Sequence, residues 1–531
     1  MDYSLYEVTG LSENIADHAK NYETIISAIK ICRKNGLKGL KLPKGAFAVY
    51  NDKATELSEL LLSSEVGATD YAYWQSHPNV LFDIDGFESF TVAGNDTTLL
   101  FDGLIGAFDV KNTGKAEIEG VTVDWITPLF FTGRVSGIVG NKITVITDQA
   151  LKGNEPIVSF QNFDCITGHQ KGMSAFCDIS NVCREDEKTV SFESKETDGL
   201  SVGDGIIARY IYGFAPVMHF YESKNISIRN TVINAGCGMG IIAHKCEGFY
   251  AENFRVFPSG NRPMSTNTDA THFISCTGRI RFNNCMFEGM GDDAVNVHGF
   301  YIGVKRIIDR YTVVGVIEAS VQDGIADMPD AGDIIEFCSK KTLLPFANGI
   351  LAKVEFSGDA GEIILKFKGE LPDGINADCC LANASKTAEL VFENCSVKNI
   401  RGRALLIQTR NVAVRNNVFS DCTGQGIHID TAAGWWESIG TRNIEISENK
   451  FINCGYGMTK YCDAVGIVIE TEAESDAIGV HRNIVLRNNR IEGKNTGIKA
   501  KCVENLELKG NRFIGCKTQY DLSSCKNVKI D

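Results

Sequence analysis

The stretch NVAVRNNVFSDCTGQGIHIDT, residues 411–431, carries the pattern that decides the predicted fold. In its first six residues the second and fourth positions are Val412 and Val414, separated by the small Ala413 and flanked by the polar Asn411 and Arg415. The same alternation returns at Ile427 and Ile429. Alternation with a period of two is typical of a strand that buries one face. This unit therefore predicts two strands joined by a turn.

Both strand types recur along the chain. Copies of the first begin at residues 225, 248, 279, 389, 411, 443, 483 and 505, and copies of the second lie near residues 240, 292, 402, 424, 464 and 495. From 225 to 248 the repeat is 23 residues, and from 389 to 411 and from 483 to 505 it is 22, which is typical of one solenoid coil. We predict an all-β, right-handed parallel β-helix with two strand families per coil.

Two residue types recur in a fixed register of this repeat. We expect the asparagines to hydrogen-bond from coil to coil and the cysteines to be small buried thiols. The asparagines are Asn230, Asn253, Asn284, Asn394, Asn416 and Asn488, and the cysteines form the sets Cys422, Cys454, Cys516 and Cys285, Cys395.

The coil pattern is absent from both the start of the chain and two internal segments. An amphipathic helix is predicted over Glu23–Lys34, where it would cap the exposed end of the coils. Hairpin-like runs replace the coil pattern in the two segments, which predicts two inserted small β-barrel-like domains. The expected division is 1–126 (cap and first coils), 127–215 (first insertion), 216–300 (coils), 301–386 (second insertion) and 387–531 (last coils).

Composition excludes several classes of partner. The chain has 531 residues with 53 Lys and Arg against 67 Asp and Glu, a net charge of −14, which argues against nucleic acid or an anionic membrane. Eighteen cysteines without CxxC spacing fit a reducing compartment. We expect a cytoplasmic protein as the sequence stands, or a secreted or periplasmic one if a leader has been removed. The oligomeric state is open, with a homodimer among the options.

Clustered acids mark the candidate site. FEGMGDDAVNVHGFY, residues 287–301, contains Asp292 and Asp293, and Asp269 lies 23 residues before Asp292. We expect Asp269 and Asp292 to share a register in successive coils, about 4.8 Å apart, with Asp293 beside them. Three such carboxyl groups cannot all ionise easily, which favours a general acid beside a general base. A calcium site and a purely structural turn remain alternatives.

Further polar residues surround these acids in the predicted coils. A sugar site needs such hydrogen-bonding groups for hydroxyls, although each could instead be structural. Arg403 shares the register of Asp293 and could bind a hydroxyl or form an ion pair. The other candidates are Asn296 and His298 on the strand after the acids, His244 in register with His298, and His272 three residues after Asp269.

The long loop DTAAGWWESIGTRN, residues 430–443, offers an aromatic surface. Trp435 and Trp436 are two of only four tryptophans in the chain, and one of them is expected to stack on a sugar while the other packs. Asp430 and Glu437 flank them and could bind hydroxyls. Tyr461 and Asp463 in the next long loop are weaker candidates.

The motif GMGDDAVNVHG, together with TNTDATHF before it, resembles glycoside hydrolase family 110, the α-1,3-galactosidases. The resemblance covers most of the chain. It implies a β-helix with two inserted β-barrels that removes terminal α-1,3-linked galactose from blood group B type glycans with inversion. It further implies that Asp292 is the general acid, that Asp269 and Asp293 orient and deprotonate water, and that no metal or other cofactor takes part.

Two points stay open beside this resemblance. Inversion requires roughly 6.5–9.5 Å between acid and base carboxyl groups and retention about 5–5.5 Å, and simple stacking would give the shorter spacing. A calcium-dependent polysaccharide lyase and a non-catalytic glycan-binding β-helix are the alternative functions for such a fold.

Overall fold

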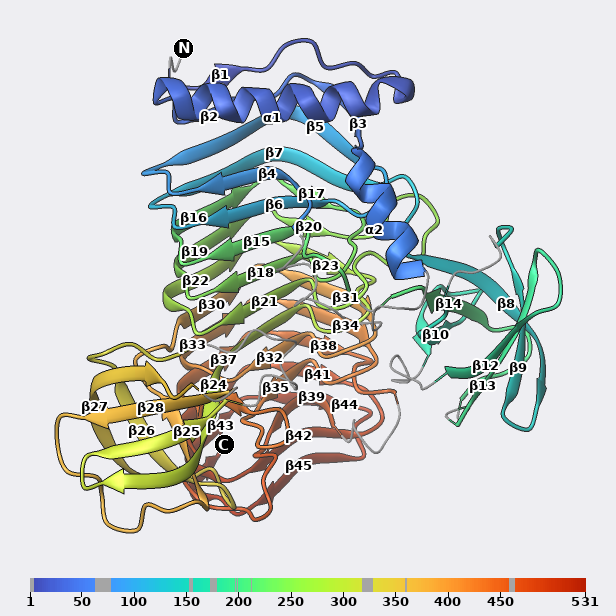
Figure 1. The fold of residues 1–531 in the computed structure, drawn as a ribbon. Helices are drawn as coiled ribbons and strands as arrows, with labels where there is room; N and C mark the ends of the chain where they lie inside the picture. The colour runs from blue at the N-terminus through green and yellow to red at the C-terminus, as the bar shows by residue number, and fades with distance from the viewer. Residues whose placement is uncertain are drawn as a thin grey trace.

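The computed structural model describes residues 4–62, 78–151, 156–171, 179–195, 197, 199–211, 213–317, 328–358, 361–457 and 464–531. Figure 1 shows a stack of parallel strands that runs from an N-terminal helix to the C-terminus, with two smaller β-structures attached at its side. The predicted parallel β-helix with a capping helix is confirmed. Tyr461 and Asp463 lie outside the described residues. Within the described ranges, no helix is long and apolar enough to cross a membrane.

Each coil contains three strands, so the prediction of two strand families was wrong. In one coil these are β16 (Lys224–Arg229), β17 (Val232–Ile233) and β18 (Ile241–His244). The next coil pairs with it in parallel through β19 (Glu247–Glu252), β20 (Arg255–Val256) and β21 (Thr271–Ile274). The family that was missed has strands of only two to five residues, which are too short to show alternation clearly.

The strands of each family stack in register along the axis. The first family comprises β5 (Phe90–Phe101), β7 (Ala116–Trp125), β16, β19, β22 (Thr277–Asn283), β30 (Glu389–Glu393), β33 (Arg410–Arg415), β37 (Arg442–Ser447), β40 (His481–Arg487), β43 (Val503–Lys509) and β46 (Lys526–Ile530). The second comprises β17, β20, β23 (Met286–Glu288), β31 (Ser396–Ile400), β34 (Val418–Cys422), β38 (Lys450–Ile452), β41 (Arg490–Glu492) and β44 (Arg512–Ile514). The third comprises β4 (Val80–Asp85), β6 (Gly106–Lys111), β15 (Met218–Tyr221), β18, β21, β24 (Val295–Asp309), β32 (Leu405–Ile407), β35 (Ile427–Ile429), β39 (Ala464–Ile469), β42 (Thr496–Lys501) and β45 (Thr518–Ser523).

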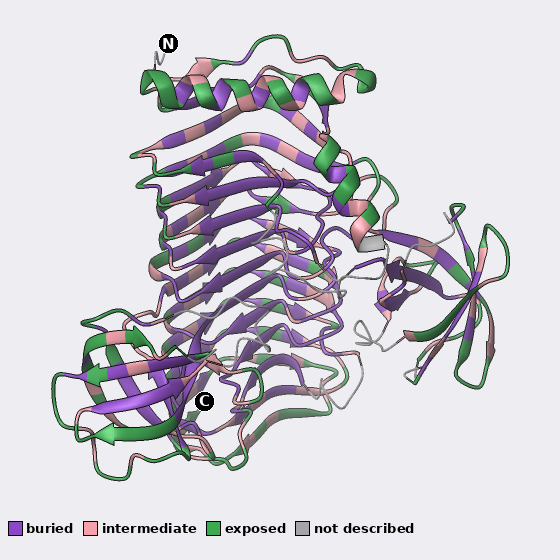
Figure 2. Cartoon of the chain, in the orientation of Figure 1, coloured by how far each residue is buried: buried purple, intermediate pink, exposed green. Residues whose placement is uncertain are grey.

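The predicted repeat register is confirmed by a column of buried apolar side chains. These residues occupy the second position of each copy of the repeat and pair from strand to strand: Ile226, Phe249, Ile280, Leu390, Val412, Ile444, Ile484 and Leu506. Ile280 and Leu390 are direct partners across the second insertion. The coils therefore continue past that insertion, and Figure 2 shows their interior as buried along the stack.

Helix α1 (His18–Asn35) contains the predicted segment and lies across the N-terminal end of the coils (Figure 1). Its buried face includes Ile25, Ile29 and Cys32. The helix ends at Gly36, which has a φ of 65° and donates its backbone N–H to the Cys32 carbonyl. The sequence did not predict the short helix α2 (Asp52–Leu62). Two short N-terminal strands, β2 (Gly39–Lys41) and β3 (Gly45–Val49), pair with β5, and β1 (Tyr6–Glu7) pairs with β2.

The first insertion is an antiparallel sheet with its own apolar core. In spatial order its strands are β11 (Gln170–Lys171), β10 (Ser159–Phe163), β14 (Gly205–Arg209), β8 (Phe130–Val139), β9 (Lys142–Thr147), β13 (Thr189–Ser194) and β12 (Ile179–Arg184). Among the described residues, no pairing joins β11 to β12. This sheet is therefore open there, unlike a closed barrel.

The second insertion is a closed antiparallel barrel. Its ring runs from β24 to β25 (Thr312–Val316), β28 (Glu362–Phe367), β27 (Pro345–Phe356), β26 (Ile334–Ser339) and β29 (Cys379–Asn383), and back to β24. Strand β24 begins in the β-helix and continues into the barrel. Buried Glu336 anchors the barrel to the coils through Arg410 and Arg442, each 2.8 Å away. The division of the chain at residues 126, 215, 300 and 386 stays a prediction.

The predicted asparagine ladder forms in part. Asn253 donates to Asn230 at 2.9 Å and Asn284 donates to Asn253 at 2.6 Å, each from a backbone with positive φ. Asn394 departs from the predicted ladder because it donates to Asn283, and Asn488 donates to Glu448. The predicted thiol sets are buried at Cys285, Cys395, Cys422 and Cys454, whereas Cys516 is partly exposed.

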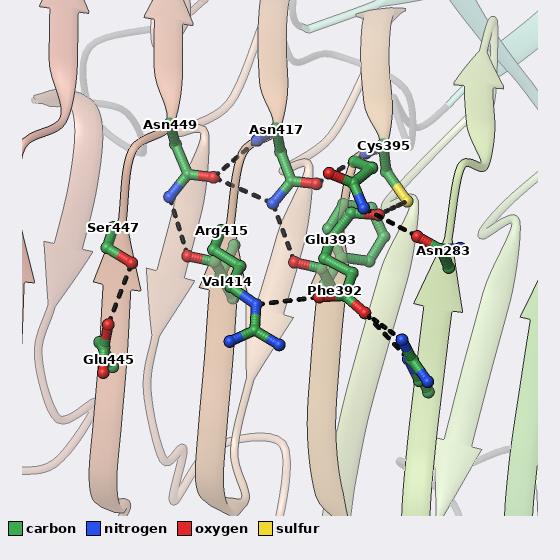
Figure 3. Close-up of polar contacts among 12 residues, drawn as sticks. Asn283, Phe392, Glu393, Cys395, Val414, Arg415, Asn417, Glu445, Ser447 and Asn449 are labelled. Atoms are coloured by element: carbon green, nitrogen blue, oxygen red, sulfur yellow. Dashed lines mark hydrogen bonds and ion pairs between the residues drawn. The ribbon is translucent and has the colours of Figure 1, made fainter.

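A second, buried asparagine ladder was not predicted. It consists of Asn417, Asn449, Asn489 and the partly buried Asn511 (Figure 3 shows the first two). Asn449 accepts from the backbone and side chain of Asn417 at 3.0 and 2.9 Å and donates to the Val414 carbonyl at 2.9 Å. These amides satisfy backbone groups in turns that would otherwise be buried without partners.

We expect Asn449→Ala to lower the free energy of unfolding by about 2–3 kcal/mol, because it leaves several buried polar groups unpaired. The matched control is Asn443→Gly. Asn443 belongs to an exposed ladder, where its side chain donates to Asn411 at 3.0 Å. Its φ is 59°, a backbone conformation that glycine also adopts. The control should cost less than about 1 kcal/mol. Urea-induced unfolding measures the free energy of unfolding of both variants. An equal decrease in the two would contradict the structural importance of the buried ladder.

Candidate active site

The three predicted acids come together in the turns that precede β21 and β24. Thr271 pairs with Val295, so this coil is 24 residues long rather than the 23 counted from the sequence. Asp269 is therefore aligned with Asp293, and the expected alignment with Asp292 was wrong by one residue. The backbone N–H of Asp293 donates to Asp269 Oδ1 at 3.1 Å.

Arg403 continues the column formed by Asp269 and Asp293. Val295 pairs with Leu405, which places Arg403 in the register of Asp293 as predicted. Its backbone N–H and Nε contact Asp293 Oδ1 at 2.7 and 3.0 Å, and its Nη2 contacts Oδ2 at 2.7 Å. Both oxygens of Asp293 are thus held by one arginine in a bidentate ion pair.

Asp292 is the most accessible of the three acids. Its side chain is 21% exposed, against 7% for Asp269 and 2% for Asp293. Burial raises the pKa of Asp292 to about 7, and the charges of Asp293 and Asp269 add to this rise. Arg401 lies 2.9 Å from Asp292 Oδ1, and its positive charge opposes this rise in the pKa. At neutral pH Asp292 is therefore able to hold a proton and release it.

Gly402 makes room for this arrangement. A Cβ at this position would lie 2.6 Å from Asp293 Oδ1 and 2.8 Å from Asp292 Oδ1, closer than real Cβ contacts. A glycine between Arg401 and Arg403 therefore allows both acids to approach the backbone of the next coil.

Asp269 lies at the end of a chain of hydrogen bonds through two histidines. His298 Nδ1 donates to the Gly299 carbonyl at 2.9 Å, which leaves Nε2 of a neutral His298 as an acceptor. His272 Nε2 must then donate to it at 2.6 Å, and His272 Nδ1 meets Asp269 Oδ2 at 2.7 Å. This bond needs one proton, carried by either Asp269 or His272. Burial and the nearby charge of Asp293 raise the pKa of Asp269 well above its usual value.

The three acids could in principle hold a cation, since each offers an oxygen within 4.8 Å of the others. The groups around them fit that use poorly. Arg403 occupies both oxygens of Asp293, His272 occupies one of Asp269, and Arg401 pairs with Asp292. Two guanidinium groups beside the cluster would repel a divalent ion. The arrangement favours proton transfer over metal binding.

The polar residues predicted on the strands form an outward-facing row beside the acids. His272 pairs with Asn296 in adjacent strands, whereas their neighbours Phe273 and Val297 face the core. Asn296 is 4% exposed, and its Oδ1 has no hydrogen-bond partner within the described part of the chain. His244 stands two strands from His298 in the same register, as expected, with its ring 5.3 Å from that of Tyr221.

The loop after β35 separates the two tryptophans. Trp436 packs against the second barrel near Tyr301, with Lys340 Nζ 5.9 Å from the centre of its ring. Trp435 is 58% exposed, and its predicted contact with a sugar stays a prediction. Glu437, at β36 (Glu437–Ser438), accepts a hydrogen bond from Gln408, and its Oε1 lies 3.9 Å from His298 Nε2.

Asp430 is buried two strands beyond β24 on the same face. Its neighbours His428, Glu470 and Lys499 were missed in the sequence, together with Arg401 and Gln408. A usable signal existed for His428, which occupies the register of Asn296 two coils later. The pairing of Arg401 with Asp292 had none, because the two residues lie in coils separated by the whole second insertion and do not share a register.

Substituting Arg401 by methionine should raise the pKa of Asp292 further above 7, because the cation that favours the charged carboxylate is lost. Carbon-13 NMR of aspartate-labelled protein follows this titration, and Arg415→Met on an outer face of the coils serves as the control. A pKa of Asp292 that does not rise in Arg401→Met would contradict the ion pair.

Known proteins share both the fold and most of the length of this chain. The family model described as a right handed beta helix region matches residues 375–473, which agrees with the predicted handedness. An α-1,3-galactosidase A from Shewanella woodyi is 25% identical and aligns with 90% of this chain and 80% of its own length. An α-1,3-galactosidase B from Bacteroides thetaiotaomicron is 23% identical over 95% of this chain and 87% of its own length.

A further relative is more similar over a shorter span. An α-1,3-galactosidase B from Bacteroides fragilis is 32% identical over 59% of this chain and 58% of its own length. These similarities agree with the resemblance drawn from the motifs around Asp269 and Asp292: the chain is homologous to proteins named α-1,3-galactosidase A and B.

Proposed function

We propose that the protein is an exo-acting α-galactosidase that hydrolyses terminal α-1,3-linked galactose from blood group B type or linear α-1,3-galactosyl glycans, with inversion. The observation that carries this proposal is the partly exposed Asp292, whose pKa of about 7 lets it hold a proton beside two more deeply buried acids. The relatives of this chain are named as α-1,3-galactosidases, which supports the same proposal.

Asp292 is the proposed general acid. Cleavage of a glycosidic bond requires a proton on the departing oxygen, and a carboxyl group with a pKa near the working pH supplies it efficiently. Arg401, 2.9 Å away, would stabilise the carboxylate that remains after the proton has left. The acid would be reset by a proton from solvent, which its 21% exposure permits.

Asp269 and Asp293 are the proposed groups that orient and deprotonate the attacking water. Asp293 would provide a fixed negative charge because Arg403 holds both of its oxygens. Asp269 would accept the proton of the water in the state in which the proton of its bond to His272 lies on the His272 ring. Asn296, Trp435 and Glu437 would bind the sugar around these acids. His298 would hold His272 in place through their hydrogen bond, and Trp436 would support the loop.

The spacing of the acids bears directly on the stereochemistry. Their nearest oxygens lie within 4.8 Å, which resembles a retaining pair more than the roughly 6.5–9.5 Å of an inverting pair. Inversion is what the family resemblance implies, and it requires the bound sugar and water to lie across the outer oxygens of these carboxyl groups. The anomer released therefore decides this part of the proposal.

The first test follows hydrolysis of a terminal α-1,3-galactosyl oligosaccharide by proton NMR, with and without a chelator. The wild type should release β-galactose first, at a rate that the chelator does not change. Asp292→Asn should lower kcat by about 10²–10⁴-fold, because the substituted amide has no acidic proton to give.

The remaining outcomes separate the alternatives. Lys509→Gln, on the outer face of β43, is the control that should keep wild-type activity. Release of α-galactose first would mean retention. An unsaturated product that absorbs in the ultraviolet and needs calcium would identify a polysaccharide lyase, and binding without any product would identify a glycan-binding protein.

A further inference from the structure

We propose that the outward face of β35, β39 and β42, formed by His428, Asp430, Glu470 and Lys499 together with Gln408, is a subsite for the neutral sugar residue to which the departing galactose is attached. This inference rests on the proposed function and names where the leaving part of the substrate is held.

Among the residues that the structure describes, several buried polar atoms on or beside this face have no hydrogen-bond partner. They are Nδ1 of His428, Oε1 of Gln408 and Oγ of Ser438, in side chains that are 4%, 1% and 1% exposed as residues. Leaving such groups unsatisfied costs free energy, and native structures rarely do so. Together they offer acceptors and donors of the kind that bind sugar hydroxyls.

The register places this face next to the acids. His428 pairs with Leu406, which pairs with Asn296, so His428 lies two strands from the site, or about 10 Å along the axis. Gln408 lies between them, and its side-chain amide donates to Glu437, whose carboxylate is 3.9 Å from His298. One pyranose ring is therefore a suitable length to connect the two regions.

The order of the proposed acid and base along the β-helix indicates on which side of the acids the leaving sugar lies. Asp269 precedes β21, Asp292 precedes β24 in the next coil, and the arginine that pairs with Asp292 precedes β32 in the coil after that. The proposed acid, Asp292, thus stands one coil to the C-terminal side of Asp269, the group proposed to accept the proton of the water. Because the acid protonates the departing oxygen, the leaving sugar lies on that same side, toward β35 and β39.

The charges on this face are balanced, which favours a neutral ligand. His428 Nε2 lies 3.3 Å from Glu470 Oε1, and Lys499 Nζ lies 3.3 Å from Glu470 Oε2. Burial raises the pKa of Asp430 to about 7, and its neighbour Glu472 adds to the rise. A uronate would meet Glu470 and Glu472 here, whereas hydroxyl or N-acetyl groups can use the free acceptors and donors.

The test compares two substrates that differ only in the leaving group. Galactose α-1,3-linked to galactose carries a leaving sugar, and α-galactosyl fluoride carries none. The variant His428→Gln keeps a donor near the position of Nε2, toward Glu470, and removes Nδ1. We expect the ratio of kcat/KM for the disaccharide to kcat/KM for the fluoride to fall by about tenfold, mainly through KM.

His481→Gln is the matched control. His481 is equally buried, but both of its ring nitrogens have partners, in Thr441 at 2.9 Å and the Glu470 carbonyl at 2.7 Å. Any decrease in kcat/KM in this variant should be of the same proportion for the disaccharide and for the fluoride. Should His428→Gln fail to fold, Lys499→Gln replaces it, with an expected fall in the ratio of at least about threefold.

The outcomes distinguish this inference from the proposed function. If the wild type hydrolyses neither substrate, the proposed function fails. If it hydrolyses both and the ratio is unchanged in His428→Gln or Lys499→Gln, the galactosidase assignment stands and the subsite is overturned.

Discussion

The stacking of successive coils at the spacing of hydrogen-bonded parallel strands is the constraint on which this molecule depends. At about 4.8 Å, residues of equal register lie directly above one another, whatever their chemistry. Where the residues are apolar, as at Ile226 and Phe249, the stack forms the core. Where they are amides, as at Asn417 and Asn449, it forms a ladder. Where they are Asp269, Asp293 and Arg403, it forms an acid site.

The same constraint explains why the three acids have different partners and exposures. Repulsion between stacked carboxyl groups must be relieved by a cation or by a proton. Arg403 relieves it at Asp293, and the bond with His272 relieves it at Asp269. Asp292 has Arg401 on one oxygen only and remains partly exposed, so its proton is the one that can be exchanged with a ligand. Gly402 permits this closeness because it adds no side chain between the coils.

The insertions enclose the site without interrupting the stack. Strand β24 starts beside the acids and ends in the second barrel, so the barrel is held by the strand that follows Asp292 and Asp293. The first insertion reaches the same region through the buried Arg209, whose Nε donates to the carbonyl of Asn267 at 3.1 Å, two residues before Asp269. Both sides of the acid cluster are thus supported by structures outside the coils.

Much of the fold could be predicted because each copy of the repeat has apolar residues at alternate positions. The first and third strand families and the column that contains Ile280 and Leu390 follow from that alternation. The capping helix follows from a separate amphipathic segment. The short second strand family could not be found, since strands of two to five residues are too short to show a clear period. The acids were found as a group, but their alignment was wrong by one residue because the turn before Asp293 is longer by one than the turn that was counted.

Contacts made by loops were beyond prediction for a different reason. The sequence could not separate Trp435 from Trp436, because their roles depend on where the second barrel packs. Arg401 pairs with Asp292 across coils separated by the whole second insertion. Such contacts follow from three-dimensional packing and leave no local pattern in the chain.

The most direct measurement of the central claim is a crystal structure of the Asp292→Asn protein with an intact α-1,3-galactosyl oligosaccharide. The account predicts the galactosyl ring beside Asp269 and Asp293, with the glycosidic oxygen within hydrogen-bonding distance of the side chain at position 292. A sugar bound elsewhere, or a metal ion coordinated by the remaining carboxyl groups, would contradict it.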